Sequence, residues 1–144
     1  MALPAQPRLH HIALTVTDLD ASVAWYQQVF GVRRVNEVPH PDGTALILAT
    51  SDRTLMFALH RHETNGHETF RETRTGLDHV GLSVPSRADL EAWQDHLQAC
   101  GVMRAHAASQ PLTQSPITDA PYASVLVFRD PDNIQLELTA PPPS

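Results

Sequence analysis

The sequence has one cysteine and no lysine. Cys100 has no partner within the chain, so an intrachain disulfide is excluded and a small buried residue near a helix end is expected. The ten basic residues are scattered arginines and the net charge is −6, which argues against a nucleic-acid partner. No run approaches the ~20 apolar residues of a membrane span, and the N-terminal stretch lacks a signal-peptide pattern. We therefore expect a cytoplasmic protein with no membrane partner.

Two stretches of the chain repeat almost position for position. Residues 9–16 (LHHIALTV) and residues 77–84 (LDHVGLSV) share the pattern Leu-x-His-(Ile/Val)-small-Leu-(Ser/Thr)-Val. The 68 residues that separate His11 from His79 also separate Trp25 from Trp93, each in a segment of helical character. A constant offset across strand and helix indicates a duplicated unit. With 144 residues and 42% hydrophobic residues, both units fit one domain, residues 1–144.

Each copy is predicted to contain a strand, a helix and three further strands. Module one spans about residues 8–61, with strands at 9–16, 32–38, 44–50 and 54–60 and a helix at 21–30. A polar connection follows at 62–76. Module two spans about residues 77–140, with a helix at 87–99, strands at 77–84, 102–108, 122–128 and 134–139, and a proline-containing loop at 109–121. Residues 141–144 are expected to be a frayed tail.

His11, His79 and Glu137 are the candidate metal ligands. The two histidines alternate with apolar residues, so both are expected on the unpacked face of related strands. Glu137 lies between Leu136 and Leu138, where a carboxylate is costly unless it is paired, hydrogen-bonded or bound to a cation. If the modules pair about a pseudo-twofold axis, the three side chains can converge. Two imidazoles and one carboxylate suffice to hold a divalent transition metal and leave positions for substrate.

The other histidines are weaker candidates. His10 is on the packed side or at the strand edge, and His60 is on the unpacked side, where it could be a fourth ligand, a base or a surface residue. The remaining five are interpreted as solvated surface residues: His40, His62, His67, His96 and His106. A single histidine on a strand is more often structural than a ligand, so the recurrence of His11 and His79 at one register carries the metal hypothesis.

Three segments together resemble the vicinal oxygen chelate superfamily: residues 11–26, 76–84 and 127–138. That superfamily includes glyoxalase I, extradiol dioxygenases, fosfomycin-resistance enzymes and bleomycin-resistance proteins. The resemblance implies an α+β fold in which two pseudo-symmetric βαβββ modules form a curved, cup-like mixed sheet with the helices packed outside, usually in a homodimer. It also implies a divalent metal, held by His11, His79 and Glu137, that is chelated by vicinal oxygens of a small organic substrate.

One departure from the family pattern narrows the choice of metal. Glyoxalase I carries a fourth ligand, a glutamate in the last strand of its first module, and the alternation of that strand puts Ala58 at the matching position. The remaining two-histidine, one-carboxylate set resembles that of the extradiol dioxygenases. It favours Fe(II) and leaves Mn(II), Ni(II) and Zn(II) as alternatives. Those dioxygenases also use a catalytic histidine, a role open to His62 or His67 only if the connection folds over the cup.

Three hypotheses of function follow. The first is a metal-dependent enzyme of the dioxygenase or glyoxalase-type lyase class, with His60 and Tyr122 as candidate catalytic residues. The second is a binding protein that sequesters its ligand without turnover, as bleomycin-resistance relatives do. The third is a metal-stabilised scaffold. The intact ligand set favours the enzyme, because sequestering relatives generally lack the ligands.

Overall fold

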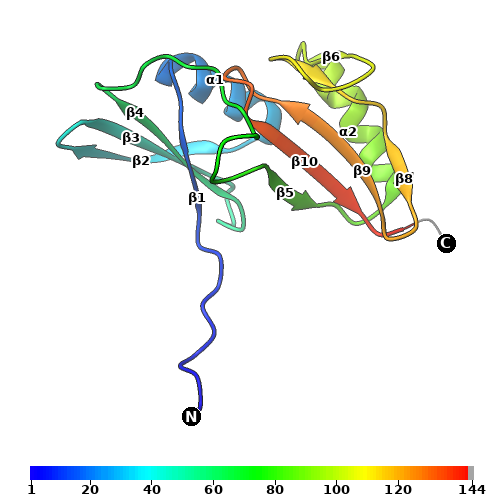
Figure 1. Cartoon of the computed structure of the whole chain (residues 1–144), viewed down its shortest axis with the longest axis horizontal. Coiled ribbons are helices and arrows are strands. Elements are labelled where there is room, and N and C mark those ends of the chain that lie inside the picture. Colours follow the sequence, from blue (N-terminus) through cyan, green and yellow to red (C-terminus); the bar gives the residue numbers. More distant parts are fainter. Residues whose placement is uncertain (143–144) are drawn as a thin grey trace. The chain divides into compact units, whose positions relative to one another are not determined.

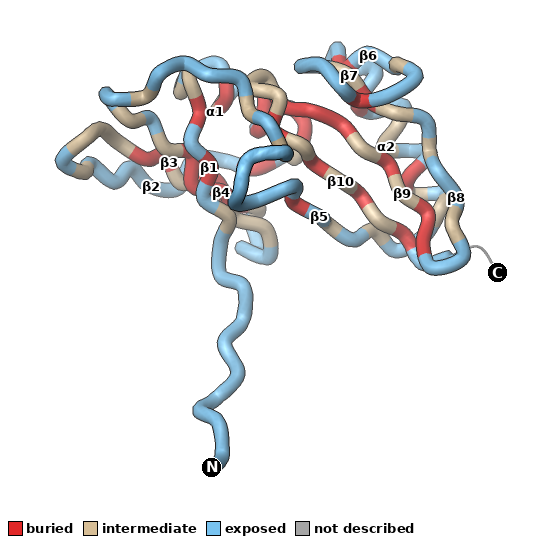
Figure 2. The backbone as a smooth tube through the Cα atoms, viewed as in Figure 1, coloured by how far each residue is buried: buried red, intermediate tan, exposed pale blue. Residues whose placement is uncertain are grey.

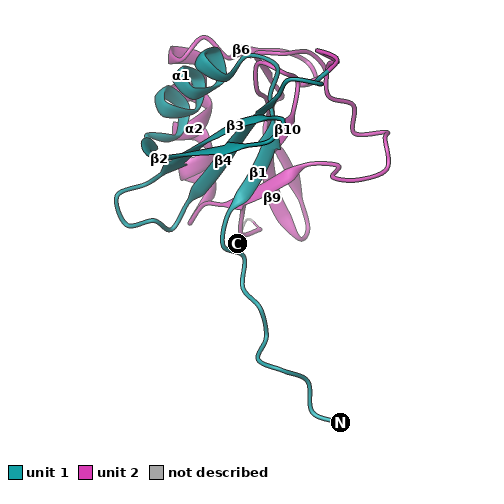
Figure 3. Cartoon of the chain, turned by 90° about the vertical axis from the view of Figure 1, so that its left-hand side faces the viewer, with its two compact units in different colours: residues 1–65 teal, residues 66–144 magenta. Residues whose placement is uncertain are grey.

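The computed structural model describes residues 1–142 and has an α+β fold with two helices and two open mixed sheets. The chain divides into two compact units, unit 1 (Met1–Asn65) and unit 2 (Gly66–Ser144), each with one helix and one sheet (Figure 3). The boundary falls inside the connection predicted at 62–76. The predicted frayed tail includes residues 143 and 144, which lie outside the described residues.

Unit 1 has the predicted βαβββ order. Its elements are β1 (Ile12–Thr15), α1 (Leu19–Phe30), β2 (Arg33–His40), β3 (Gly43–Ala49) and β4 (Met56–His62), with sheet order β1-β4-β3-β2 (Figure 1). β1 and β4 are parallel, and the β2–β3 and β3–β4 pairs are antiparallel. The first strand is shorter than predicted, because residues 1–11 form an exposed arm that leads into it.

Helix α1 begins and ends where its sequence signals lie. The Asp18 side chain accepts a hydrogen bond from the Ala21 amide, and Gly31 closes the helix in the left-handed conformation. Its apolar face covers β3 and β4, and the rings of Tyr26 and Phe57 lie 4.9 Å apart. Burial of this face sets the orientation of β4: Phe57 and Leu59 point to the helix, and Ala58 and His60 point to the opposite face.

Unit 2 repeats this plan with a divided outer strand. Its elements are β5 (Val80–Ser83), α2 (Arg87–Ala99), β6 (Met103–Arg104), β7 (Thr113–Gln114), β8 (Thr118–Ala120), β9 (Ala123–Arg129) and β10 (Gln135–Ala140). The order is β5-β10-β9-β7-β6, and β8 also pairs with β9. Neither helix of the described residues is long and apolar enough to cross a membrane.

Two predictions for unit 2 are wrong. The strand expected at 102–108 is reduced to the two residues of β6, and the loop expected at 109–121 contains β7 and β8. Pro111, Pro116 and Pro121 all lie outside these short strands, so each proline interrupts the pairing with β9 without occupying a ladder position. The outer strand is therefore built from short pieces.

Equivalent strands pair in the same way in both units. β1 pairs with β4 and β5 pairs with β10, in each case in parallel. Along β10, buried Leu136 and Leu138 alternate with partly exposed Gln135, Glu137 and Thr139, which gives the alternating colours of this strand in Figure 2. The polar face predicted for the last strand is confirmed.

Candidate metal centre

Unit 2 brings His79 and Glu137 together across two parallel strands. His79 directly precedes β5, and Glu137 lies opposite Gly81, which adds no side chain between them. The distance from His79 Nε2 to Glu137 Oε2 is 3.5 Å, longer than a normal hydrogen bond. Two ligands bound to one cation at about 2.1 Å with tetrahedral geometry are about 3.4 Å apart. The two atoms are therefore spaced as ligands of one cation.

Neighbouring side chains orient both groups. His79 Nδ1 lies 2.7 Å from Asp78 Oδ1, and the same oxygen accepts a hydrogen bond of 3.1 Å from Gln135 Nε2. Because a carboxylate only accepts, Asp78 can accept from a protonated Nδ1 of His79, and Nε2 is the ring nitrogen that faces Glu137. Thr139 Oγ1 donates to the other oxygen of Glu137 at 3.0 Å. Such carboxylate–histidine pairs are typical of the second shell of metal sites.

Arg129 anchors this polar face to the body of unit 2. Its guanidinium donates to Gln135 Oε1 at 2.8 Å and to both carboxylate oxygens of Glu72 at 3.0 Å each. Its Nε also donates to the Ala108 carbonyl, and the side chain is only 6% exposed. The hydrogen bonds from Arg129 lower the pKa of Glu72 to about 2. A continuous chain of polar contacts thus runs from Glu72 through Arg129, Gln135 and Asp78 to His79.

A cavity of about 540 Å³ lies on the same face of the β9–β10 pair, within the range of about 300–1,000 Å³ of small-molecule sites. Val127 lines it and pairs with Glu137, so both side chains point to one side of the sheet. The other lining residues also belong to unit 2: His106, Ala107, Ala108, Ser109, Ser115, Pro116, Thr118, Arg129 and Gln135. The cavity therefore offers polar and apolar groups on the sheet face that carries Glu137, and its lining residue Gln135 contacts Asp78.

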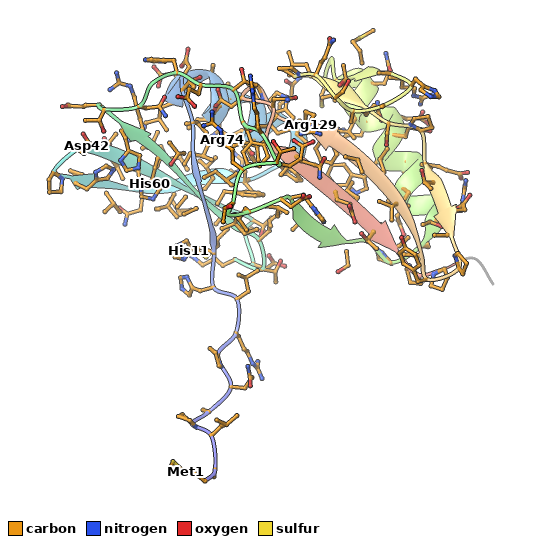
Figure 4. All side chains as sticks on the ribbon, in the orientation of Figure 1. Met1, His11, Asp42, His60, Arg74 and Arg129 are labelled. Atoms are coloured by element: carbon orange, nitrogen blue, oxygen red, sulfur yellow. The ribbon has the colours of Figure 1, made fainter. Side chains whose placement is uncertain are left out.

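His11 occupies the equivalent place in unit 1. It directly precedes β1, as His79 precedes β5, so both histidines lie just before the strands in which they were expected. His11 is exposed, and its Nδ1 is 2.9 Å from Nδ1 of His10 (Figure 4). His11 and His79 therefore occupy equivalent positions, each relative to the first strand of its own unit. The convergence of His11 with His79 and Glu137 stays a prediction.

Ala58 is the unit 1 counterpart of Glu137. Ala58 pairs with Ala13 in β1, and Glu137 pairs with Gly81 in β5. Ala13 and Gly81 are 68 residues apart, the offset of the repeat. By the same relation, His60 is the counterpart of Thr139, because they pair with Thr15 and Ser83. Unit 1 therefore has no carboxylate at the register that carries one in unit 2.

His40, His60 and His62 form a cluster in unit 1 that the sequence interpretation missed. Each offers a ring nitrogen, and these three atoms lie within 4.8 Å of one another. Nε2 of His40 is buried, so the interpretation of His40 as a solvated surface residue is wrong, whereas the His62 side chain is 36% exposed. Burial, followed by the nearby His40, His62 and His11, lowers the pKa of His60. The Asp42-Gly43 turn was the available signal for this cluster. It pairs β2 with β3, and β3 pairs in turn with β4, so histidines of β2 and β4 can lie on one face.

Tyr122 lies in the turn between β8 and β9 and is 79% exposed. The strand expected to begin at Tyr122 begins at Ala123, because Pro121 and Tyr122 form the turn. This position adds no support for a catalytic role. The catalytic roles of Tyr122 and His60 stay predictions.

Comparison with known proteins gives a consistent family match. The model of the Glyoxalase/Bleomycin resistance protein/Dioxygenase superfamily matches residues 8–138. The chain is 26% identical over 136 residues to the uncharacterized protein YqjT of Bacillus subtilis (strain 168), with 92% of this chain and 98% of YqjT covered.

Solved structures agree with the fold. The glyoxylase/bleomycin resistance protein/dioxygenase domain from Frankia sp. EAN1pec has a TM-score of 0.80 and 29% identity, covering 95% of this chain and 99% of that chain. A mutant of the fosfomycin resistance protein FosX from Listeria monocytogenes, complexed with Mn(II) and 1S,2S-dihydroxypropylphosphonic acid, has a TM-score of 0.63 and 18% identity. The match covers 92% of this chain and 88% of that chain, a likeness of fold alone.

Proposed function

Because the chain belongs to the Glyoxalase/Bleomycin resistance protein/Dioxygenase superfamily, we propose that it is a divalent-metal-dependent enzyme of the dioxygenase or glyoxalase-type lyase class. Its substrate would be a small organic compound that offers two vicinal oxygens. The observation that carries this proposal is the spacing of His79 Nε2 and Glu137 Oε2 at 3.5 Å, with the second nitrogen of the imidazole held by Asp78.

The residues of unit 2 fit a divalent cation. Glu137 would bind through Oε2 while Thr139 occupies Oε1, and His79 would bind through Nε2 while Asp78 fixes its tautomer. The side chains of His79 and Glu137 are 38% and 22% exposed, so both are partly accessible to solvent. A carboxylate and a neutral imidazole together suit Fe(II), Mn(II), Ni(II) and Zn(II), with Fe(II) favoured.

We assign the third ligand to His11 because of the repeat. It stands 68 residues before His79, at the same position relative to its strand. We also propose a homodimer, in which His11 comes from the same chain as Glu137 or from the partner subunit. Mixing inactive His11→Ala and Glu137→Ala chains distinguishes the two arrangements. Metal binding is restored in a mixed dimer only if the ligands are exchanged between chains.

The cation and the residues of the chain would have different roles in the reaction. A bound divalent cation supplies Lewis-acid polarisation of substrate oxygens and stabilises developing negative charge. The chain holds the ligands in place through Asp78, Gln135 and Arg129, whose contacts would persist when substrate enters. The cavity beside Val127 and Gln135 would orient the substrate.

The sequestering function is the second candidate, since the superfamily includes bleomycin resistance proteins. A ligand screen distinguishes it from catalysis. Protein reconstituted with Fe(II) or Mn(II) under anaerobic conditions is incubated with catechols and with 2-hydroxy ketones, then with oxygen. Mass spectrometry follows each compound. Conversion by wild-type protein, but not by Glu137→Ala, supports the enzyme, and tight binding with quantitative recovery of the unchanged compound contradicts it.

A further inference from the structure

Unit 1 gathers three imidazoles on one face of its sheet, in the cluster of His40, His60 and His62. We propose that this cluster is a second metal site, built from other residues than the pair of His79 and Glu137. It would bind one imidazole-preferring divalent cation such as Zn(II) or Ni(II).

Strand register places the three side chains together. His40 in β2 pairs with Gly43 in β3, which pairs with His62 in β4, so the two histidines flank a residue without a side chain. In the next row on the same face of the sheet, His60 pairs with Ala45, another small residue. Directly paired residues point to the same side of a sheet, and so do residues two apart on one strand. All three imidazoles therefore share one face, over two small residues of the middle strand.

Gly43 is required for this arrangement. A Cβ atom at this position would lie 1.9 Å from the Arg61 carbonyl oxygen and 3.3 Å from Cε1 of His40. The absence of a side chain lets the rings of His40 and His62 approach to 4.9 Å between centroids. The ring of His60 lies 5.4 Å from that of His40 and 5.8 Å from that of His62. The middle strand thus leaves the space that the three rings occupy.

Two ring nitrogens are prepared as ligands. Nε2 of His40 is buried and has no hydrogen-bond partner, which is costly for a polar atom unless a ligand satisfies it. Nδ1 of His62 lies 3.3 Å from Asp42 Oδ2, and Asp42 also accepts a hydrogen bond of 2.7 Å from Thr64 (Figure 4). This arrangement directs Nε2 of His62 away from Asp42. A carboxylate behind a ligating histidine is the usual second shell of a metal site.

The separations require only small side-chain movements. The three nitrogens lie within 4.8 Å of one another, and three ligands of a tetrahedral zinc are about 3.4 Å apart. Rotation of the imidazoles about their side-chain torsions closes this difference, which is at most about 1.4 Å. The fourth position of the ion would be left to water or to an incoming ligand.

Metal titration of variants tests the proposal. The full-length His79→Ala/Glu137→Ala double variant removes the other candidate site and is titrated with Zn(II) and Ni(II) by calorimetry. We expect one bound equivalent. Adding His40→Ala or His62→Ala should weaken that binding at least about 100-fold, whereas adding His96→Ala, an exposed histidine of α2 that does not line the cavity, should leave it unchanged. A folded double variant that binds no metal would overturn the proposal.

Two controls separate this result from other failures. Circular dichroism checks folding, and His62→Gln replaces His62→Ala if the alanine variant unfolds. Equal metal affinity in the double variant with and without the cluster substitutions would also overturn the proposal. Failure of the pair of His79 and Glu137 has a different signature, because wild-type protein would then bind one equivalent that only the cluster substitutions remove.

Discussion

His79 is oriented by its neighbour before any cation binds. The contact of 2.7 Å with Asp78 fixes one nitrogen, and Gln135 holds Asp78 in turn. A ligand whose rotamer and tautomer are already set loses less freedom on binding. The affinity of the candidate metal centre should therefore depend on Asp78, although Asp78 itself is not proposed as a ligand.

The first prediction concerns this support. Asp78→Ala should lower the affinity for Mn(II) or Fe(II) by about 10–100-fold without abolishing binding, the range typical of removing a residue that orients a metal ligand. Anaerobic calorimetric titration measures it. Asp20→Ala, an exposed aspartate of α1, is the matched control and should bind like wild type. Equal affinity of the Asp78→Ala variant and the control would refute the orienting role.

The second prediction concerns Gly43. Its φ of +156° and the distance of 1.9 Å from an added Cβ to the Arg61 carbonyl oxygen leave no space for alanine. Gly43→Ala should lower the free energy of unfolding by about 1–3 kcal/mol or more, measured by urea denaturation. At Gly66 an added Cβ would meet only the Glu68 side chain at 3.8 Å, so Gly66→Ala should change stability by less than about 0.5 kcal/mol. Equal effects at the two glycines would contradict this account.

At the scale of elements, helix α1 depends on its N-terminal cap. Asp18 accepts a hydrogen bond of 3.0 Å from the Ala21 amide, one of the otherwise unpaired donors of the first turn. Asp18→Ala should therefore cost about 1 kcal/mol of unfolding free energy, and Asp20→Ala, in the same turn without the capping contact, only a few tenths. Thermal and urea denaturation of both variants measures this, and comparable losses would argue against the cap.

The sequence predicted the elements whose signals are local. The helices predicted at 21–30 and 87–99 are found, with Asp18 and Ser86 as their N-terminal caps, and the alternation around Glu137 predicted the faces of β10. The division of the outer strand of unit 2 was missed, because prolines predict interruption but do not show that the short pieces between them still pair with β9. Local signals thus predicted where an element lies better than which strands pair with each other.

The same limit applies to the candidate sites. The repeat pointed to His11 and His79 as candidate ligands, and the alternation with Leu136 and Leu138 pointed to Glu137. The cluster of His40, His60 and His62 depends on the register of three strands, in which Gly43 separates two of the histidines. Asp78 and Gln135 likewise became supporting residues only when β5 and β10 were paired. Contacts between strands cannot be read from the spacing of one strand.

At the scale of the whole molecule, the Glu72–Arg129 ion pair links folding to pH. The folded-state pKa of Glu72, about 2, is below its ordinary value of 4.5. Its stabilising contribution is therefore fully present above about pH 4.5 and is lost as the pH falls from there towards 2. Because the Glu72 side chain is 35% exposed, solvent screening reduces this contribution.

The corresponding prediction compares wild type with Glu72→Gln. The variant should be less stable than wild type at pH 7, and the difference should shrink as the pH falls from about 4.5 towards 2, since Glu72 is progressively protonated over this range. Urea midpoints at the two pH values measure it. Arg87→Gln, which removes an exposed ion pair with Asp119, serves as a control for general loss of charge. A difference between wild type and Glu72→Gln that does not depend on pH would contradict the linkage.

We propose that this chain holds a catalytic divalent cation through His79 and Glu137, with His11 as the third ligand. The most direct test is elemental analysis of protein purified without added metal or chelator, and again after anaerobic addition of Fe(II) and Mn(II). We predict one equivalent of iron or manganese that survives in the His40→Ala/His62→Ala variant and is lost in each of His11→Ala, His79→Ala and Glu137→Ala. Retention of that equivalent in the folded His79→Ala and Glu137→Ala variants would contradict the claim.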